Sequence, residues 1–254
     1  MLSQILYNPV VSKTRAYLHT LSHPRTLMQE RRLTRSGIDP SLHKSYDLAW
    51  LRAIHFDLIL DVGAARGGHT CLFRSLFPEA EIHAFEPLPQ SLKILHKQIS
   101  GFSGISVHPI ALSDRNTKTK LYLGGQNFYD SSSLLPMSAT HKRLFKGSGS
   151  DETVEIETRC LDNVIDSGSY RNIFIKMDVQ GAELAVIGGG ERIFSEAKVV
   201  ITEVSFLHLY EGDALFEDVF AKMLSLGLRF NGMLSQFNDV TGKIIQGDAI
   251  FLRN

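Results

Sequence analysis

Four carboxylates each follow or end a run of strand-like, apolar residues. Asp61 lies in "LILDVGAARGGHT", Glu86 in "EIHAFEP", Asp178 in "NIFIKMDV" and Glu203 at the end of "VVITE". The carboxyl ends of parallel strands meet at one edge of an open sheet, so we expect these side chains to share a cleft. Carboxylates placed there can accept hydrogen bonds from hydroxyl or ammonium groups, or remove a proton from a hydroxyl.

A glycine-rich turn, "GAARGGHT", follows the first of these runs. A dinucleotide-binding turn needs a second glycine so that the backbone can approach a pyrophosphate, and Ala65 stands at that position. A phosphate-binding P-loop needs a lysine, and His69 stands there. The turn therefore fits NAD poorly. The hypothesis of an ATP- or GTP-dependent enzyme rests on the incomplete P-loop match alone.

S-adenosylmethionine fits the turn better because it presents an amino-acid group and a ribose but no phosphate. Asp61 can accept hydrogen bonds from the ammonium group, while Gly63, Ala64 and Gly67 allow the chain to pass close to a ligand. Glu86 comes 25 residues after Asp61 and can accept hydrogen bonds from both ribose hydroxyls. The alternative for the glycines is a tight turn from strand to helix with no ligand.

Apolar runs alternate with amphipathic runs of helical length from residue 57 onward. The apolar runs are "DLILDVGA", "EIHAFEP", "ISVHPIAL", "NIFIKMDV" and "KVVITEVS", and the helical ones cover residues 70–77, 89–99, 182–194 and 215–226. This alternation predicts an α/β fold whose mostly parallel sheet carries helices on both faces. The runs "LRFNGML" and "DAIFLRN" close the chain and predict a C-terminal antiparallel hairpin. Class I methyltransferases have this order of elements.

Two segments lie outside the alternation. Residues 1–55 form an accessory arm with helical patches and a net charge of +5, because eight Lys and Arg stand against three Asp and Glu. We interpret this charge as a solvated helical face, with docking to an acidic partner as the alternative. Residues 56–254 form the main domain, with an insertion at 117–165. There "TKTKLYLGG" and "ETVEIETRCLDNVI" predict extended segments separated by loops, at a place where a flap could cover a substrate.

Methyl transfer to a hydroxyl requires in-line alignment and removal of the hydroxyl proton. Asp178 is the leading candidate for this general base or for orienting the acceptor, and it is also predicted to contact the bound cosubstrate. Strand alternation sets Lys176 on the same side as Asp178, where an ion pair or a shared approach to the ligand is sterically allowed. Glu203 and His208 are further catalytic candidates. No metal is the favoured prediction, and a divalent cation held by Asp178, Glu183 and Glu203 is the alternative.

Several motifs resemble the FkbM family of S-adenosylmethionine-dependent methyltransferases. They are "ILDVGAARGGHT", "AFEPLPQSLKIL", "ALSD", "SSSLLP", "ETRCLDNVI" and the most specific one, "IKMDVQGAELAVIGGG". The resemblance implies a Rossmann-like class I methyltransferase fold and O-methylation of a hydroxyl on a sugar, polysaccharide or secondary metabolite. The family's turn commonly reads Gly-Ala-Asn, whereas Ala65 and Arg66 stand here. Arg66 is then a solvent-facing substitution or an added cation at the cosubstrate carboxylate.

Three more residues are predicted to bind the cosubstrate. Asp114, in "ALSD", follows the third strand on the same sheet edge as Glu86, where it can reach the adenine amino group. A turn or capping aspartate is the alternative. Pro87 and Ala111 adjoin these strand ends and complete the predicted site. The alternative function is a non-catalytic, Rossmann-like binding or scaffolding protein, which has no need for carboxylates at these strand ends.

Composition restricts the partners. Lys and Arg together number 27, as do Asp and Glu, so the overall charge favours no nucleic acid or anionic lipid. Cys71 and Cys160 are far apart and fit no metal spacing, and no apolar run approaches the length of a membrane span. We therefore expect a cytoplasmic protein that acts on a small-molecule or glycan acceptor. A homodimer formed through the arm is left open.

Overall fold

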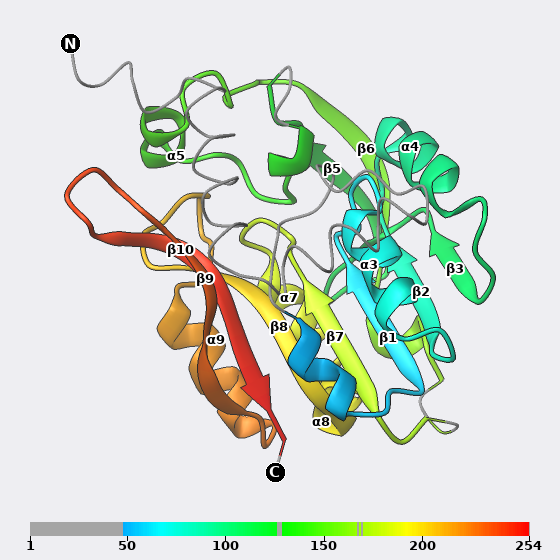
Figure 1. Ribbon diagram of the computed structural model, residues 1–254. Coiled ribbons are helices and arrows are strands. Elements are labelled where there is room, and N and C mark those ends of the chain that lie inside the picture. Colours follow the sequence, from blue (N-terminus) through cyan, green and yellow to red (C-terminus); the bar gives the residue numbers. More distant parts are fainter. Residues whose placement is uncertain (1–47, 126–128, 167, 169, 254) are drawn as a thin grey trace, which may run out of the picture.

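The computed structural model describes residues 48–125, 129–166, 168 and 170–253, and its main feature is a seven-stranded sheet (Figure 1). Five neighbouring strands are parallel, the sixth runs antiparallel to both of its neighbours, and the seventh again has the direction of the first five. In spatial order the strands are β3 (Ile105–His108), β2 (Glu81–Phe85), β1 (Leu58–Val62), β7 (Ile173–Met177), β8 (Ala197–Ser205), β10 (Ile244–Leu252) and β9 (Arg229–Asn238). The predicted parallel sheet and C-terminal hairpin are confirmed.

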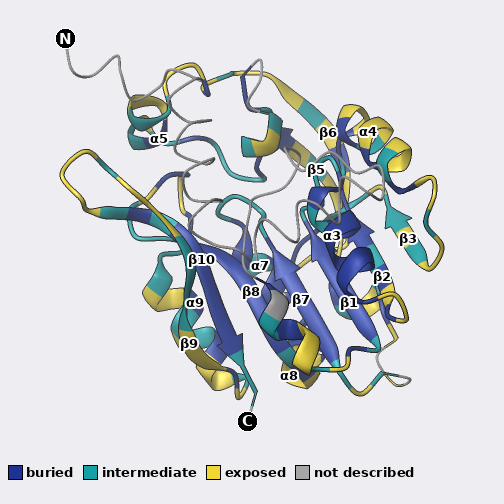
Figure 2. Cartoon of the chain, viewed as in Figure 1, coloured by how far each residue is buried: buried dark blue, intermediate teal, exposed yellow. Residues whose placement is uncertain are grey.

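Helices cover both faces of this sheet because its central strands are apolar on both sides. All five residues of β1 are buried; Ile59 packs on one face, while Leu58 and Leu60 pack on the other. The first face carries η2 (Ala49–Ala53), α3 (Gly68–Leu76) and α4 (Pro89–Ile99). The second carries α6 (Leu161–Val164), α7 (Glu183–Gly188), α8 (Glu191–Glu196) and α9 (Phe216–Ser225). The central strands are accordingly buried and the outer helix faces exposed (Figure 2).

The segment predicted as an insertion forms most of a second, smaller sheet. Its strands lie in the order β4 (Ala111–Leu112), β6 (Thr153–Arg159) and β5 (Thr117–Tyr122), with β5 and β6 antiparallel. Between them come η3 (Tyr129–Ser131) and α5 (Ala139–Leu144). A short bridge from Tyr122 to Ser133 returns the connecting loop to β5. The first extended segment is therefore confirmed, and the second is confirmed as far as Arg159. Together they form a wall beside the large sheet.

Three local predictions are wrong. The run "ISVHPIAL" divides at Pro109, which lacks an N–H, so β3 and β4 belong to different sheets. The helix predicted over 182–194 is two helices that break at Gly189, where a Cβ would lie 2.0 Å from the carbonyl oxygen of Ser113. The extended run through "CLDNVI" ends at Arg159, and α6 follows.

The predicted arm of residues 1–55 lies mostly outside the described residues. Its last part is described and includes η2, where Leu48 and Leu51 are buried against the core. Within the described chain, no helix has both the length and the apolar character needed to cross a bilayer.

Strand register brings the predicted carboxylates to one edge of the large sheet. Val62 pairs with Met177 in β7 and with Phe85 in β2. Asp178 and Glu86 each follow these paired residues directly, so the register sets both beside the turn that begins at Gly63.

Candidate functional site

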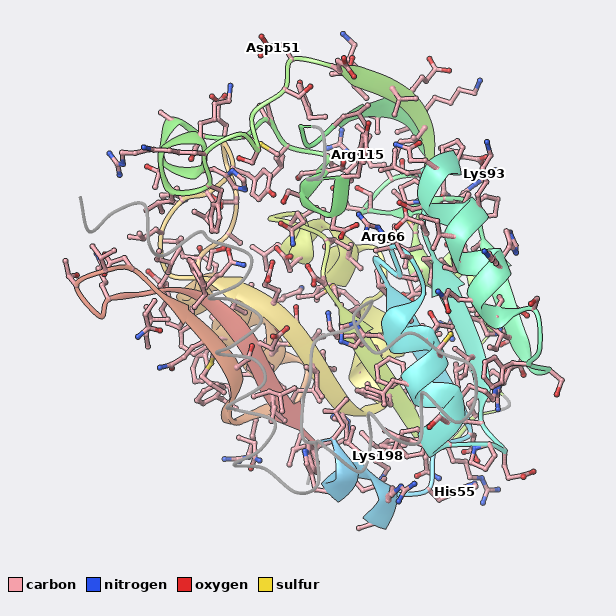
Figure 3. All side chains as sticks on the ribbon, turned by 45° about the horizontal axis from the view of Figure 1, so that its top comes forward. His55, Arg66, Lys93, Arg115, Asp151 and Lys198 are labelled. Atoms are coloured by element: carbon pink, nitrogen blue, oxygen red, sulfur yellow. The ribbon has the colours of Figure 1, made fainter. Side chains whose placement is uncertain are left out.

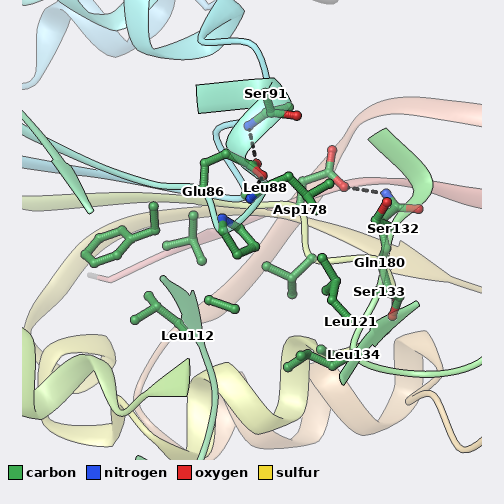
Figure 4. Close-up of a pocket in the computed structure, with 18 of the residues that line it drawn as sticks. Glu86, Leu88, Ser91, Leu112, Leu121, Ser132, Ser133, Leu134, Asp178 and Gln180 are labelled. Atoms are coloured by element: carbon green, nitrogen blue, oxygen red, sulfur yellow. Dashed lines mark hydrogen bonds between the residues drawn. The ribbon is translucent and has the colours of Figure 1, made fainter. Parts of the chain in front are cut away.

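A cavity opens where β1, β2 and β7 end. Its empty volume is about 620 Å³, counting the part open to solvent. The main domain supplies Gly63, Glu86, Asp178 and Gln180, and the smaller sheet and its loops supply the opposite wall (Figure 4). The predicted clustering of strand-end side chains is therefore confirmed for Glu86 and Asp178.

The glycine turn is pressed against the end of β7. Gly63 has a φ of 78°, and a Cβ on it would lie 2.0 Å from the carbonyl oxygen of Asp178. A side chain here would both strain the backbone and separate the two strand ends. The absence of a side chain at Gly63 thus allows the turn and Asp178 to lie together at the wall of one cavity. Ala64 and Gly67, which were also predicted to bind the cosubstrate, are not among the residues that line it.

Glu86 is almost fully buried at the cavity wall, 6% exposed. The backbone N–H of Ala65 donates to one carboxylate oxygen at 2.9 Å, and the N–H of Leu88 donates to the other at 2.8 Å. Burial raises the pKa of Glu86 to about 7; these two hydrogen bonds oppose the shift, and nearby Asp130 and Asp61 add to it. Glu86 is therefore a fixed acceptor whose charge changes near neutral pH.

Ala65 stands in a backbone conformation that L-residues rarely adopt. Its φ is 47°, and its N–H is the donor to Glu86. Glycine or asparagine would occupy this left-handed position with less strain. The departure from the family's Gly-Ala-Asn turn therefore leaves the fold of the turn intact and keeps a backbone donor on Glu86.

Asp61 and Lys176 are buried behind the cavity and do not line it. Asp61 accepts a hydrogen bond of 2.5 Å from the Thr70 hydroxyl on α3, and burial raises its pKa to about 6. The Lys176 ammonium lies 3.4 Å from Oδ2 of Asp178, so the ion pair expected from strand alternation is present. The contact of Asp61 with a cosubstrate ammonium group stays a prediction.

Sequence reasoning missed Gln180, which contacts both Asp178 and Glu203. Its amide nitrogen donates to Oδ1 of Asp178 at 2.6 Å and to Oε2 of Glu203 at 2.7 Å. Glu203 is buried, and its other oxygen accepts from the Gln246 amide at 2.9 Å. Glu203 therefore reaches the site through Gln180 and does not line the cavity itself. The only sequence signal for Gln180 was its position two residues after Asp178.

The alternative metal site is not formed. Glu183 is buried, and its Oε1 accepts from the backbone N–H groups of Val179 and Gly181 at 3.4 and 3.3 Å, so it closes the turn before α7. Burial raises its pKa to about 7. In the described part of the chain, no three His, Cys, Asp or Glu side chains come together as metal ligands. The proposed set of Asp178, Glu183 and Glu203 is therefore withdrawn.

Two other candidates lie away from the cavity. His208 is 63% exposed and pairs with Asp213 at 2.7 Å, a hydrogen bond that raises the histidine pKa. Asp114 is half exposed and lies 3.7 Å from the Arg115 guanidinium. Neither lines the cavity, whereas Pro87 and Ala111 do. An adenine contact by Asp114 stays a prediction.

The smaller sheet and its loops supply a wall that sequence reasoning could not assign to residues. Leu121 of β5 and Leu134 of the following loop meet the apolar end of the cavity, beside Ile110 and Leu112. At the polar end, Asp130 of η3 lies 3.6 Å from the guanidinium of Arg66, which is on the turn before α3 (Figure 3). Arg66 thus pairs with the predicted insertion, an arrangement that neither earlier interpretation included.

The fold and the site together define the class of protein. A sheet in the order β3-β2-β1-β7-β8-β10-β9, in which only β10 runs antiparallel to the other strands, is the Rossmann-like architecture of class I methyltransferases, and its cavity lies at the strand ends. The profile of the Methyltransferase FkbM domain matches residues 61–230, and the chain belongs to that family.

Sequence identity to individual proteins is low. The chain is 30% identical over 160 residues to the 2-O-methyltransferase NoeI of Sinorhizobium fredii, a match covering 61% of this chain and 66% of that protein. It is 28% identical over 149 residues to the hexuronic acid methyltransferase AglP of Haloferax volcanii, covering 58% and 56%. The matches thus span less than two thirds of either relative. A solved rRNA methylase from Streptococcus thermophilus is 14% identical, with a TM-score of 0.45 and coverage of 81% of this chain and 93% of that one.

Proposed function

We propose that this protein transfers a methyl group from S-adenosylmethionine to a hydroxyl of a sugar, polysaccharide or secondary metabolite. The observation that carries the proposal is the single cavity that joins Glu86 to Asp178 across the Gly63 turn. Membership of the FkbM family supports it independently. The names of NoeI and AglP, one a 2-O-methyltransferase and the other acting on a hexuronic acid, favour a sugar acceptor for this chain as well.

The cavity has the two kinds of surface that this cosubstrate requires. Its apolar end is formed by Ile110, Leu112, Leu121 and Leu134 and suits the adenine ring. Next to that end, the Glu86 carboxylate has lone pairs beyond those that the two backbone N–H groups use, so it can accept hydrogen bonds from ribose hydroxyls. These residues would therefore hold the nucleoside part.

The reaction places its main demand on Asp178. Bound S-adenosylmethionine supplies an electrophilic methyl carbon: the acceptor oxygen bonds to it while the carbon–sulfur electron pair stays on sulfur. Asp178 lines the cavity and takes the hydroxyl proton as the new bond forms. The Lys176 ammonium pairs with one oxygen of the Asp178 carboxylate from behind the cavity. The carboxylate is therefore already held in place when the substrate binds, and the direction of its remaining lone pairs is fixed.

Methyl-labelled cosubstrate and a panel of hexose, hexuronic acid and deoxyhexose glycosides provide the test. Label should appear as an alkali-stable methyl ether on at least one glycoside. Asp178→Asn should lower this turnover about a hundredfold or more, the usual range for a lost general base, while binding of S-adenosylhomocysteine stays within a few-fold. Asp151→Asn, an exposed carboxylate away from the cavity, is the matched control and should leave both unchanged.

Two results would contradict this assignment. Normal turnover by Asp178→Asn would remove the base, and loss of S-adenosylhomocysteine binding in the same variant would make Asp178 a cosubstrate anchor instead.

A further inference from the structure

The Gln180 side chain is held in one orientation by three partners at the cavity. Its amide nitrogen donates to Asp178 and Glu203, and its amide oxygen accepts from the Tyr210 hydroxyl at 2.8 Å. A reversed amide would turn its oxygen toward two carboxylates, so these partners fix which atom faces which. Figure 4 shows the Gln180 amide against Asp178 at the polar end of the cavity.

The backbone of Gln180 is strained at the same position. Its φ is 55°, a left-handed value that is uncommon for a residue with a side chain. The Ser133 hydroxyl donates to its carbonyl oxygen at 2.6 Å, and Tyr210 holds the side chain from the loop after β8. Strain of this kind persists only where the surroundings hold it, and it gathers at functional sites.

Gln180 also resolves an electrostatic conflict. Asp178 and Glu203 each have an oxygen within hydrogen-bonding distance of the same amide nitrogen. Two carboxylates so close favour protonation of one of them unless donors stabilise both charges. Lys176 approaches the other oxygen of Asp178, and Gln246 donates to the other oxygen of Glu203. Of these donors, only Gln180 contacts both carboxylates.

We propose that Gln180 is a positioning residue for methyl transfer: its two amide hydrogens hold Asp178 and Glu203 side by side and direct Asp178 toward the acceptor hydroxyl. This inference rests on the proposed function, because it assigns a role within that same site. Gln180 acts through Asp178 and takes no proton itself.

A charge introduced at this position would meet several titratable groups. The introduced carboxylate of Gln180→Glu would face carboxylates and a phenol from four segments of the chain, with one ammonium group behind them. These groups are Asp178 after β7, Glu183 at the start of α7, Glu203 in β8, Tyr210 in the following loop, and Lys176 in β7. The acidic majority would favour the protonated form of the new carboxyl, which can donate one hydrogen bond.

The pH dependence of Gln180→Glu therefore distinguishes positioning from packing. At pH 8 turnover on the most reactive glycoside should fall about a hundredfold, with the KM for S-adenosylmethionine within about threefold. Relative to the wild type at saturating S-adenosylmethionine, turnover should recover as the pH is lowered and the new carboxyl gains its proton. Gln246→Glu is the charge-matched control: it also contacts Glu203 but not Asp178, so its loss should be at least tenfold smaller, without that recovery.

A second measurement needs no acceptor. Gln180→Gly keeps the left-handed backbone accessible and removes the amide, so it should fold. In protein labelled with ¹³C at aspartate carboxyls, the Asp178 resonance, assigned by its loss in Asp178→Asn, should titrate at least one pH unit higher in Gln180→Gly than in the wild type.

Each of these measurements can either support or overturn the positioning role of Gln180. Equal turnover losses in Gln180→Glu and Gln246→Glu, or an unchanged Asp178 titration in folded Gln180→Gly, would overturn the positioning role. A wild type that methylates no glycoside would count against the proposed function, while the carboxyl titration would still test Gln180.

Discussion

The charge of Glu86 should control cosubstrate affinity near neutral pH. In the free protein, burial raises the pKa of Glu86 to about 7, so the carboxyl is largely protonated at pH 6 and largely ionised at pH 8. Ribose hydroxyls donate to the ionised form, and binding should therefore release a proton. Affinity for S-adenosylhomocysteine should rise with pH through the window around 7 and then level off.

The magnitude follows from the size of the shift. If only the ionised carboxylate binds well, each pH unit below 7 weakens binding about tenfold, or about 1.4 kcal/mol. Affinity at pH 6 should thus be about tenfold below that at pH 8. Glu86→Gln removes the titration: its affinity should be about tenfold weaker than wild type at pH 8, through loss of charged hydrogen bonds, and nearly flat from pH 6 to 8.

The same group should also affect stability. A carboxyl whose pKa is raised on folding holds its proton in the folded state between pH 4.5 and about 7, while the unfolded chain has lost it. The free energy of unfolding should therefore fall as the pH rises through this window, by roughly 3 kcal/mol at most from Glu86. Asp61 and Glu183, whose pKa values are raised in the same way, add to the slope. Glu86→Gln should reduce the slope without abolishing it.

Calorimetry in buffers of different ionisation enthalpy measures both the affinity and the number of protons released. Glu79→Gln, an exposed glutamate on the loop before β2, is the control and should behave as wild type. An affinity that is independent of pH in the wild type, or a Glu86→Gln variant with the same pH dependence as wild type, would show that the charge of Glu86 does not control cosubstrate binding.

Two further variants test the walls of the cavity, and a third tests the predicted contact of Asp114, which does not line it. Gly63→Ala should lower the free energy of unfolding by more than Gly212→Ala, measured by urea denaturation, because the two glycines have φ of 78° and 79° but only Gly63 has a backbone atom in the path of a Cβ; equal losses would contradict the steric argument. Leu121→Ala should weaken S-adenosylhomocysteine binding about threefold to tenfold through lost apolar contact, and unchanged affinity would remove this wall from the site. Asp114→Asn should change the preference for adenosyl over inosyl cosubstrate analogues if Asp114 contacts adenine, and equal ratios in variant and wild type would withdraw that contact.

Local pattern was enough to predict the sheet and the carboxylates at its edge. Alternation within "NIFIKMDV" sets Lys176 and Asp178 on one side, and the observed ion pair follows from that geometry. Glu86 follows the second strand directly, and parallel register carries it to the same edge as Asp178. These predictions depend only on neighbours along a strand and on the direction of the strands.

Local sequence pattern could not predict contacts between segments that are far apart in the chain. Leu121 reaches the cavity because β5 pairs with β6, which comes more than thirty residues later. Gln180 gained its role from Tyr210 and Ser133, residues on two other loops. His208 was placed near the site because it follows β8 in sequence, yet its loop turns it toward Asp213 and solvent. In each case tertiary packing decided what the local sequence left open.

We expect the cavity between Glu86, the Gly63 turn and Asp178 to bind S-adenosylmethionine. Titration calorimetry at pH 8 with S-adenosylhomocysteine, NAD and ATP tests it directly, with Glu86→Ala measured alongside the wild type. We expect S-adenosylhomocysteine to bind to one site, at least about tenfold more weakly in Glu86→Ala, and we expect no comparable binding of NAD or ATP. Tighter binding of NAD or ATP, or an unchanged S-adenosylhomocysteine affinity in Glu86→Ala, would contradict it.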